Sequence, residues 1–186
     1  MFAVVAGKPV QMEKAGGGYD DFRRNIRAAV RGLWGGNLDM LGFLESMNRT
    51  IQRSFTIAWR EGAQAVGIRS DEQNDDEKNA LNIEINNDLM QTMGFANAIV
   101  KGSKANGGKL SPLLYRSEMW INRYTAIVSR AMSMAGRDKK LKWVWSPIKE
   151  HCGSCLKLNG RVYRASTWAK YDLRPKMHRL QCKGFR

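Results

Sequence analysis

The sequence predicts a mainly α fold, in which a helical bundle is followed by a small α+β domain. Apolar residues recur at helical spacing through most of residues 19–135. Strand-like alternation appears after them, and all three cysteines lie beyond residue 150. We expect an extended arm over residues 1–18, a helical domain over 19–110 and a C-terminal domain over 111–186.

The arm and the first helix are separated by a glycine-rich stretch. Residues 1–18 show no clear period, so we expect an extended arm, which an assembly subunit could dock on a neighbour, or a partly disordered tail. The first helix is expected to begin at Tyr19, before two acids that suit the helix dipole, and to end at Gly35. Its apolar face carries Phe22, Ile26, Ala29, Val30 and Leu33.

Two longer helices are expected next. The second covers residues 38–66, and Asn48 and Gly62 interrupt its apolar stripe, which favours packing in a bundle over a strict coiled coil. Residues 70–77 are an acidic cluster that suits the start of a third helix. Their spacing lacks the glycine and the final glutamate of a calcium loop. The expected apolar face of the third helix comprises Leu81, Ile85, Leu89, Met93, Ala96 and Val100.

A fourth helix is expected to begin at Ser111 and Pro112 and to end at Gly136. Four arginines recur along it every seven residues, so they share one stripe, and three lysines follow closely. These residues are Arg116, Arg123, Arg130, Arg137, Lys139, Lys140 and Lys142. We interpret them as a candidate contact line for nucleic acid or an acidic partner, with a solvated cationic face as the alternative.

The remaining sequence predicts a small β element. The run from Lys142 alternates and stops at Pro147, and the Asn159-Gly160 turn precedes a second short strand. Such a short element buries little apolar surface by itself, so it needs another source of stability.

The cysteines supply a candidate for that source. Cys152 and Cys155 form a C-x-x-C pair, and His178 and Cys182 follow with H-x-x-x-C spacing. Two ligands on one turn and two on a second element can close a tetrahedral zinc site, and thiolates favour zinc. We predict a structural Zn2+ ion held by these four residues in a zinc-knuckle-like domain. Free buried thiols and a redox-active C-x-x-C pair are the alternatives.

The formal charge of +14 is distributed unevenly over the 186 residues. Residues 101–186 contain 20 Lys and Arg against 4 Asp and Glu, whereas residues 1–100 contain 11 against 13. The C-terminal part is therefore expected to meet a polyanion or an acidic protein, or else to be a solvated basic surface. No apolar run reaches the length of about 18 residues that a membrane span needs, so we expect no membrane partner.

From Tyr115 onward the sequence resembles the C-terminal domain of the phage Mu F-like minor head proteins, the phage head morphogenesis family. The matching elements come in the family's order. They are Arg116-Ser117-Glu118, Trp143, Trp145, Glu150, the Cys152–Cys155 pair, the run Leu158–Tyr163, Pro175, His178 and Cys182. The family's H-P-N-C-R-C pattern is altered here, because Pro175 precedes His178 and Cys182 follows four positions after it.

The resemblance implies a virion structural protein, present in few copies in the phage head and assembled in the host cytoplasm. Its implied partners are the portal protein, other head or neck proteins and packaged DNA, within a multi-subunit assembly. Its implied role is head morphogenesis, DNA packaging or genome delivery. The uneven distribution of charge agrees with this role, since the basic residues 101–186 suit contact with DNA and the near-neutral residues 1–100 suit contact with other proteins.

A stand-alone nucleic-acid-binding protein with a zinc knuckle is the second hypothesis. Four aromatic residues could then stack on bases, although tryptophans at strand spacing are more often core residues. They are Trp143, Trp145, Tyr163 and Trp168. We do not expect an enzyme, because the sequence has two histidines and neither a glycine-rich phosphate loop nor a G-x-S-x-G motif.

Overall fold

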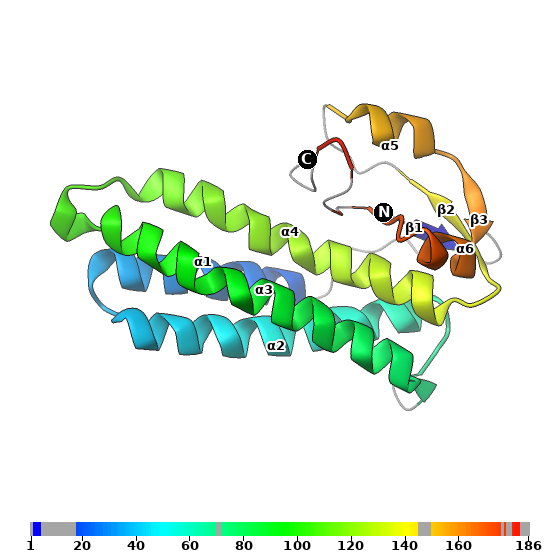
Figure 1. Cartoon of the computed structure of the whole chain (residues 1–186), viewed down its shortest axis with the longest axis horizontal. Coiled ribbons are helices and arrows are strands. Elements are labelled where there is room, and N and C mark those ends of the chain that lie inside the picture. The colour runs from blue at the N-terminus through cyan, green and yellow to red at the C-terminus, as the bar shows by residue number, and fades with distance from the viewer. Residues whose placement is uncertain are drawn as a thin grey trace.

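Four long helices and a small C-terminal piece make up the chain in a computed structural model (Figure 1). The structure describes residues 2–4, 18–69, 72–144, 150–175, 177 and 180–182. The long helices are α1 (Gly18–Gly35), α2 (Met40–Ala65), α3 (Asp75–Lys101) and α4 (Leu110–Ala135). This confirms the mainly α class and the order of a bundle followed by a small α+β piece.

Side-chain caps fix where the middle helices begin. The Asp39 carboxylate accepts a hydrogen bond from the backbone N–H of Gly42 at 2.7 Å, and α2 starts at Met40. In the same way, the Asn74 side chain accepts from the N–H of Glu77 at 2.9 Å at the start of α3. Each cap satisfies a backbone donor that the helix itself leaves unpaired.

Helix α4 packs against α1, α2 and α3, and it also carries the C-terminal piece through α6. Its approach to α2 is close, because a Cβ added at Gly62 would overlap the carbonyl oxygen of Val128. Aromatic rings fill the space on either side, with Phe95 stacked on Trp120 at 4.6 Å between ring centroids. The expected domain boundary at residues 110 and 111 therefore cuts through the packed bundle, of which α4 is the fourth helix.

The buried face of α3 differs from the expected one. Ile85 and Ala96 are buried, but Met93 is 50% exposed and Val100 40% exposed. The helix is rotated so that Glu84 and Asp88 face inward, along with other residues the apolar pattern did not predict: Glu77, Ala80, Thr92, Phe95 and Ile99. Arginines from other elements neutralise the two inward carboxylates, which is why a pattern based on apolarity alone was wrong here.

The C-terminal piece packs on α4 and contains a three-stranded antiparallel sheet in the order β1-β2-β3. Its strands are β1 (Phe2–Val4), β2 (Lys140–Trp143) and β3 (Val162–Arg164). Two short helices, α5 (Gly153–Leu158) and α6 (Ala165–Lys170), flank β3 in sequence. A single turn of 3-10 helix, η2 (Lys104–Asn106), lies in the loop between α3 and α4.

The start of the chain belongs to this sheet. Phe2 lies opposite Trp143, is 1% exposed, and contacts the Trp168 ring with 5.2 Å between centroids. Residues 2–4 therefore pair within the chain, where the sequence predicted an arm for a neighbouring subunit, because the apolar Phe2 side chain completes the aromatic core of the sheet. Residues 5–17 of the expected arm lie outside the described residues.

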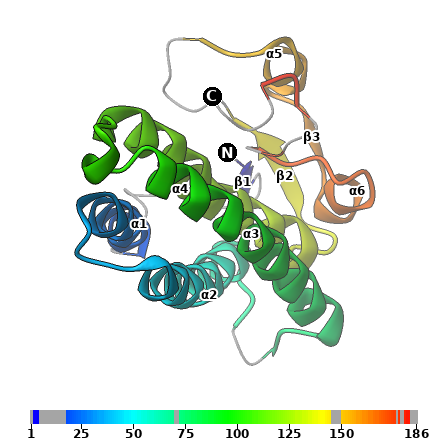
Figure 2. The ribbon, with the colours of Figure 1, turned by 60° about the vertical axis from the view of Figure 1, so that its left-hand side comes forward.

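Strand β1 and the described residues 180–182 both lie at the C-terminal piece rather than at the far end of the bundle, as Figure 2 shows from a second side. No helix in the described part of the chain combines the length and apolarity needed to cross a lipid bilayer.

Candidate metal centre

Three cysteine sulfurs converge where α5 begins. Cys152, Cys155 and Cys182 each offer one sulfur, and these atoms all lie within 4.8 Å of one another. Among the described His, Cys, Asp and Glu residues, this is the one group of three or more that could hold a metal ion. The structure thus brings together three of the four predicted ligands. The fourth, His178, lies outside the described residues.

Local backbone geometry positions the first two sulfurs. Cys152 is the N-cap of α5, with φ −72° and ψ 159°, and Cys155 follows in the first turn. The N–H of Asn159 donates to the Cys155 carbonyl at 2.9 Å, and Gly160 then turns the chain with φ 77°. This turn returns the chain to β2, where the N–H of Gly160 donates to the Trp143 carbonyl at 2.9 Å.

The third sulfur arrives from the C-terminal segment, which lies directly against α5. The backbone N–H of Gln181 donates to Ser154 Oγ at 3.2 Å. A Cβ at Gly153 would come within 2.6 Å of Gln181 Oε1, so the glycine allows this close approach. A C-x-x-C pair with two small residues between the cysteines therefore leaves room for the segment that carries Cys182.

The spacing of the sulfurs suits a soft divalent cation. Tetrahedral coordination with metal–sulfur bonds of about 2.3 Å places sulfurs about 3.8 Å apart, and the three sulfurs here lie within 4.8 Å. All three cysteines are only partly buried and pack against the edge of the hydrophobic core.

The pKa shifts of the cysteine thiols also agree with metal binding. Burial raises the pKa of Cys152, but hydrogen bonds from the backbone N–H groups of Cys155 and Cys182 outweigh burial and lower it to about 7. Burial and the neighbouring Cys152 sulfur raise the pKa of Cys155 to about 12. Close sulfurs thus resist joint ionisation without a cation, and a bound cation would remove that repulsion.

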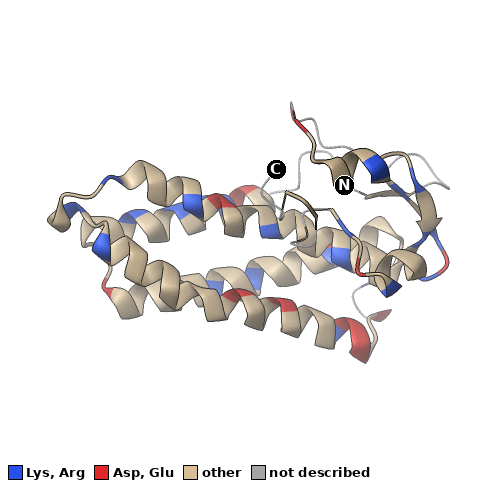
Figure 3. Ribbon diagram, turned by 45° about the horizontal axis from the view of Figure 1, so that its top comes forward, with Lys and Arg blue, Asp and Glu red and all other residues tan. Residues whose placement is uncertain are grey.

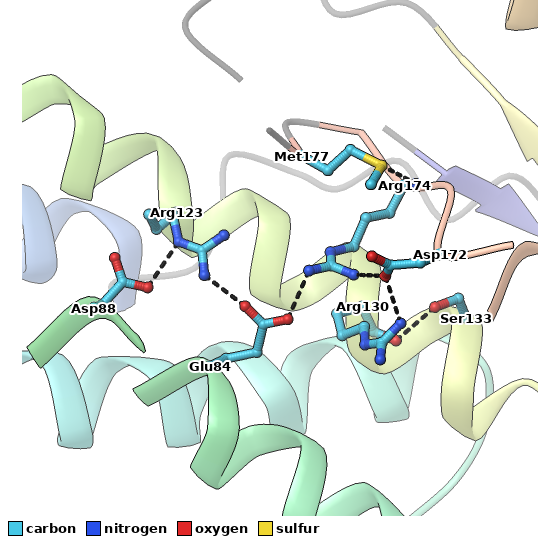
Figure 4. A network of polar contacts seen from close by, with 8 residues as sticks. All are labelled: Glu84, Asp88, Arg123, Arg130, Ser133, Asp172, Arg174 and Met177. Atoms are coloured by element: carbon cyan, nitrogen blue, oxygen red, sulfur yellow. Dashed lines mark hydrogen bonds and ion pairs between the residues drawn. The ribbon is translucent and has the colours of Figure 1, made fainter. Parts of the chain in front are cut away.

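A chain of ion pairs that runs from Asp88 to Arg130 forms a network that holds the C-terminal segment on the bundle (Figure 4). Arg174 is 5% exposed, and its guanidinium donates to Glu84 Oε1 of α3 at 2.6 Å and to the Asp172 carboxylate. Arg123 of α4 donates to the other Glu84 oxygen at 2.5 Å and to Asp88 at 2.8 Å. The network therefore joins α3, α4 and the segment that ends in Cys182.

The environment of the two α3 carboxylates explains their opposite pKa shifts. Burial alone would raise the pKa of Glu84, but Arg174 and Arg123 on either side lower it below its usual value. Asp88 has only Arg123 beside it, so burial wins and its pKa is raised. Glu84, held between two arginines, is the carboxylate at the centre of the network.

The predicted arginine line on α4 is divided between two environments. Arg123 is taken up by Glu84 and Asp88, and Arg130 pairs with Asp172 at 2.8 Å. Arg116 and Arg137 are exposed, and the Arg116 guanidinium lies over the Phe95 ring at 5.4 Å. The middle two of the four arginines therefore have carboxylate partners within the chain, and the contact line itself stays a prediction. Acids spaced i, i+4 on the facing helix α3 were the signal that sequence reasoning missed.

The three predicted lysines lie at and beyond the end of α4. The Lys139 ammonium donates to the Val66 carbonyl, whereas Lys140 and Lys142 are exposed on β2. Lys140 lies directly opposite Arg164 of β3, so two cations are neighbours on the outer face of the sheet. Figure 3 shows that basic residues are also spread over the bundle helices, where the averaged charge of the sequence had suggested neutrality.

The aromatic residues considered for base stacking lie mostly in the core. Trp143 and Trp168 are each 1% exposed, and the Trp168 Nε1 donates to the Leu141 carbonyl at 3.0 Å. Tyr163 is 45% exposed, and Trp145 lies outside the described residues. The two described tryptophans are therefore unavailable for stacking on bases because they pack the sheet against α6.

We predict that replacing Arg174 with Met destabilises the fold, because the carboxylate of Glu84 then loses a buried partner. Removal of one member of such a pair costs about 3–5 kcal/mol in the free energy of unfolding. Arg164→Ala is the matched control, since its pair with Asp138 is exposed and is worth less than about 1 kcal/mol. Urea denaturation measures both; equal losses in the two variants would contradict the role given to Arg174.

Comparison of the chain with protein-family models, with curated proteins and with solved structures gave no match. The functional argument therefore starts from the cysteine cluster, the ion-pair network and the distribution of charge.

Proposed function

We propose that this chain is a structural protein of a phage head, stabilised by a zinc ion and acting without catalysis. The observation that carries the proposal is the convergence of Cys152 and Cys155 with Cys182, across 26 intervening residues, in a lobe whose elements follow the Mu F-like order. The same order begins with Glu118, which pairs with Arg27 of α1, and continues through Trp143 in the sheet.

Zinc is the metal that the donor set favours. Three thiolates are soft ligands, and structural sites of the Cys3His type are closed by a fourth protein ligand. His178 is our candidate for that ligand. A closed site leaves no position for a substrate, so the proposed ion acts as a cross-link between α5 and the C-terminal segment.

A role next to packaged DNA is supported by the outer face of the sheet. Like charges directly opposite one another destabilise a strand pair, yet Lys140 faces Arg164 there and Lys142 is on the same face. The exposed carboxylate of Asp138 pairs with Arg164 and balances one of these three cations. A phosphate backbone would relieve the remaining repulsion. The proposed partners are accordingly DNA, the portal protein and other head or neck proteins, in a multi-subunit assembly of the virion.

The alternative is a zinc-knuckle nucleic-acid-binding protein that acts outside a particle. The cationic sheet face favours this alternative as much as the leading proposal. Base stacking does not add to it, because Trp143 and Trp168 are buried. Contacts with the phosphate backbone, without reading of sequence, are therefore what both proposals require.

The zinc proposal predicts about one Zn2+ ion per chain after purification under reducing conditions, measured by elemental mass spectrometry. Cys182→Ser should lose most of the zinc and lower the melting temperature, because its thiolate joins two segments. Ser154→Ala is the matched control: it removes a hydrogen bond to Gln181 but no sulfur, so zinc should remain. Unchanged zinc content in Cys182→Ser would contradict this site.

The virion proposal predicts that purified particles contain the chain together with the portal protein, in few copies relative to the major capsid protein. Quantitative mass spectrometry of purified particles measures those ratios. A chain recovered in equal amount to the major capsid protein, or missing from particles while abundant in the cell, would contradict a minor head role.

A further inference from the structure

The outward face of α2 carries arginines that nothing in the described fold uses. Arg49, Arg53 and Arg60 are exposed, with Gln52 and Thr56 between them. Together with Ile57 these residues line a shallow, open depression of about 550 Å³, and no acidic side chain takes part in its lining. We call Arg49, Arg53 and Arg60 the α2 arginine row.

Helix geometry places the row on one line. Positions separated by 4 and 11 residues fall within a narrow sector of a helix with 3.6 residues per turn, and the row spans about 16 Å at 1.5 Å per residue. Residues on the opposite sector, including Ile51, Phe55 and Ala58, are fully buried. The row therefore points directly away from the core and from α4, against which α2 packs.

The row is self-repulsive within the chain. Some arginines of the bundle have carboxylate partners, as Arg27 does with Glu118, whereas the exposed Arg23, Arg31 and Arg116 lie on other helices. The ion pairs among the described residues include none of the three arginines of the row. Like charges at i, i+4, as at Arg49 and Arg53, destabilise a helix, and Glu45 at i−4 from Arg49 offsets this at one end of the row only. An external anion would compensate for an arrangement that the fold itself does not need.

We propose that the α2 arginine row binds the phosphate backbone of duplex DNA. The guanidinium fork matches phosphate oxygens, and the density of charge on a duplex suits a row of this length. A second copy of the chain is a poor occupant, because two chains of formal charge +14 repel each other. The acidic residues at the start of α3 in such a second copy do not change this, because they already interact with the dipole of their own helix.

The row and the cationic sheet face lie on different sides of the molecule. The C-terminal piece packs on α4, and α2 lies along the opposite edge of the bundle in both views of the ribbon (Figures 1 and 2). One chain can therefore hold two duplex segments at once. This inference rests on the proposed role next to packaged DNA, and it assigns a second DNA contact to the helical half.

The first test measures the salt dependence of binding to a short duplex of random sequence by fluorescence anisotropy. The triple variant R49Q/R53Q/R60Q should lower the slope of log Kobs against log salt by about 0.9 per lost phosphate contact, about 2.7 in all. The triple variant K101Q/K104Q/K109Q removes the same charge from exposed lysines elsewhere and should change the slope much less. R49K/R53K/R60K should keep most of the slope.

The second test asks whether one protein molecule can bind two duplexes. One duplex is immobilised, and the amount of a second, labelled duplex that the bound protein retains is measured. Wild-type protein should bridge the two duplexes. R49Q/R53Q/R60Q should still bind one duplex through the sheet face but lose bridging, and K140Q/K142Q should also lose bridging while binding through α2. The single variant R53Q, with an expected slope change of about 0.9, covers the case of a misfolded triple variant.

The outcomes separate this inference from the proposed function. Equal effects of the arginine and lysine triple variants, or bridging that survives R49Q/R53Q/R60Q, would overturn the α2 site and leave the sheet face standing. Wild-type protein that does not bind DNA would overturn both DNA contacts. Zinc binding and incorporation into particles are measured separately, and their outcomes do not depend on the two DNA contacts.

Discussion

Arg174 fixes the position of the C-terminal segment, and the candidate metal centre depends on that position. Its guanidinium lies between Glu84 of α3 and Asp172, with only 5% of the residue exposed. The same segment ends in Cys182, whose sulfur completes the cluster at α5. The segment is thus held on the bundle by charge at Arg174, and the proposed metal ion would hold its far end to α5.

Arginines serve two separate purposes in this chain. Inside the molecule, Arg123, Arg130 and Arg174 are balanced by three carboxylates, so the network is neutral and its cost of burial is offset. Outside, the α2 arginine row has no such balance. The excess positive charge behind the formal value of +14 therefore lies on the surface of the molecule and not in the ion-pair network.

Much of the fold follows from the sequence by simple rules, because the long helices have apolar faces and clear ends. The convergence of the three cysteines was predictable too, since a C-x-x-C pair with a later cysteine is typical of residues that meet at one site. The face of α3 was not, because Glu84 and Asp88 are buried only by virtue of arginines that are distant in sequence. The place of Phe2 in the sheet was equally hidden, because pairing between the two ends of a chain leaves no local pattern.

The central claim is that one metal ion joins Cys152, Cys155 and Cys182. X-ray absorption at the zinc edge of the purified, zinc-loaded protein tests this claim most directly. The account predicts three sulfur neighbours at about 2.3 Å and one lighter neighbour at about 2.0–2.1 Å. A coordination shell made only of nitrogen and oxygen atoms would contradict it.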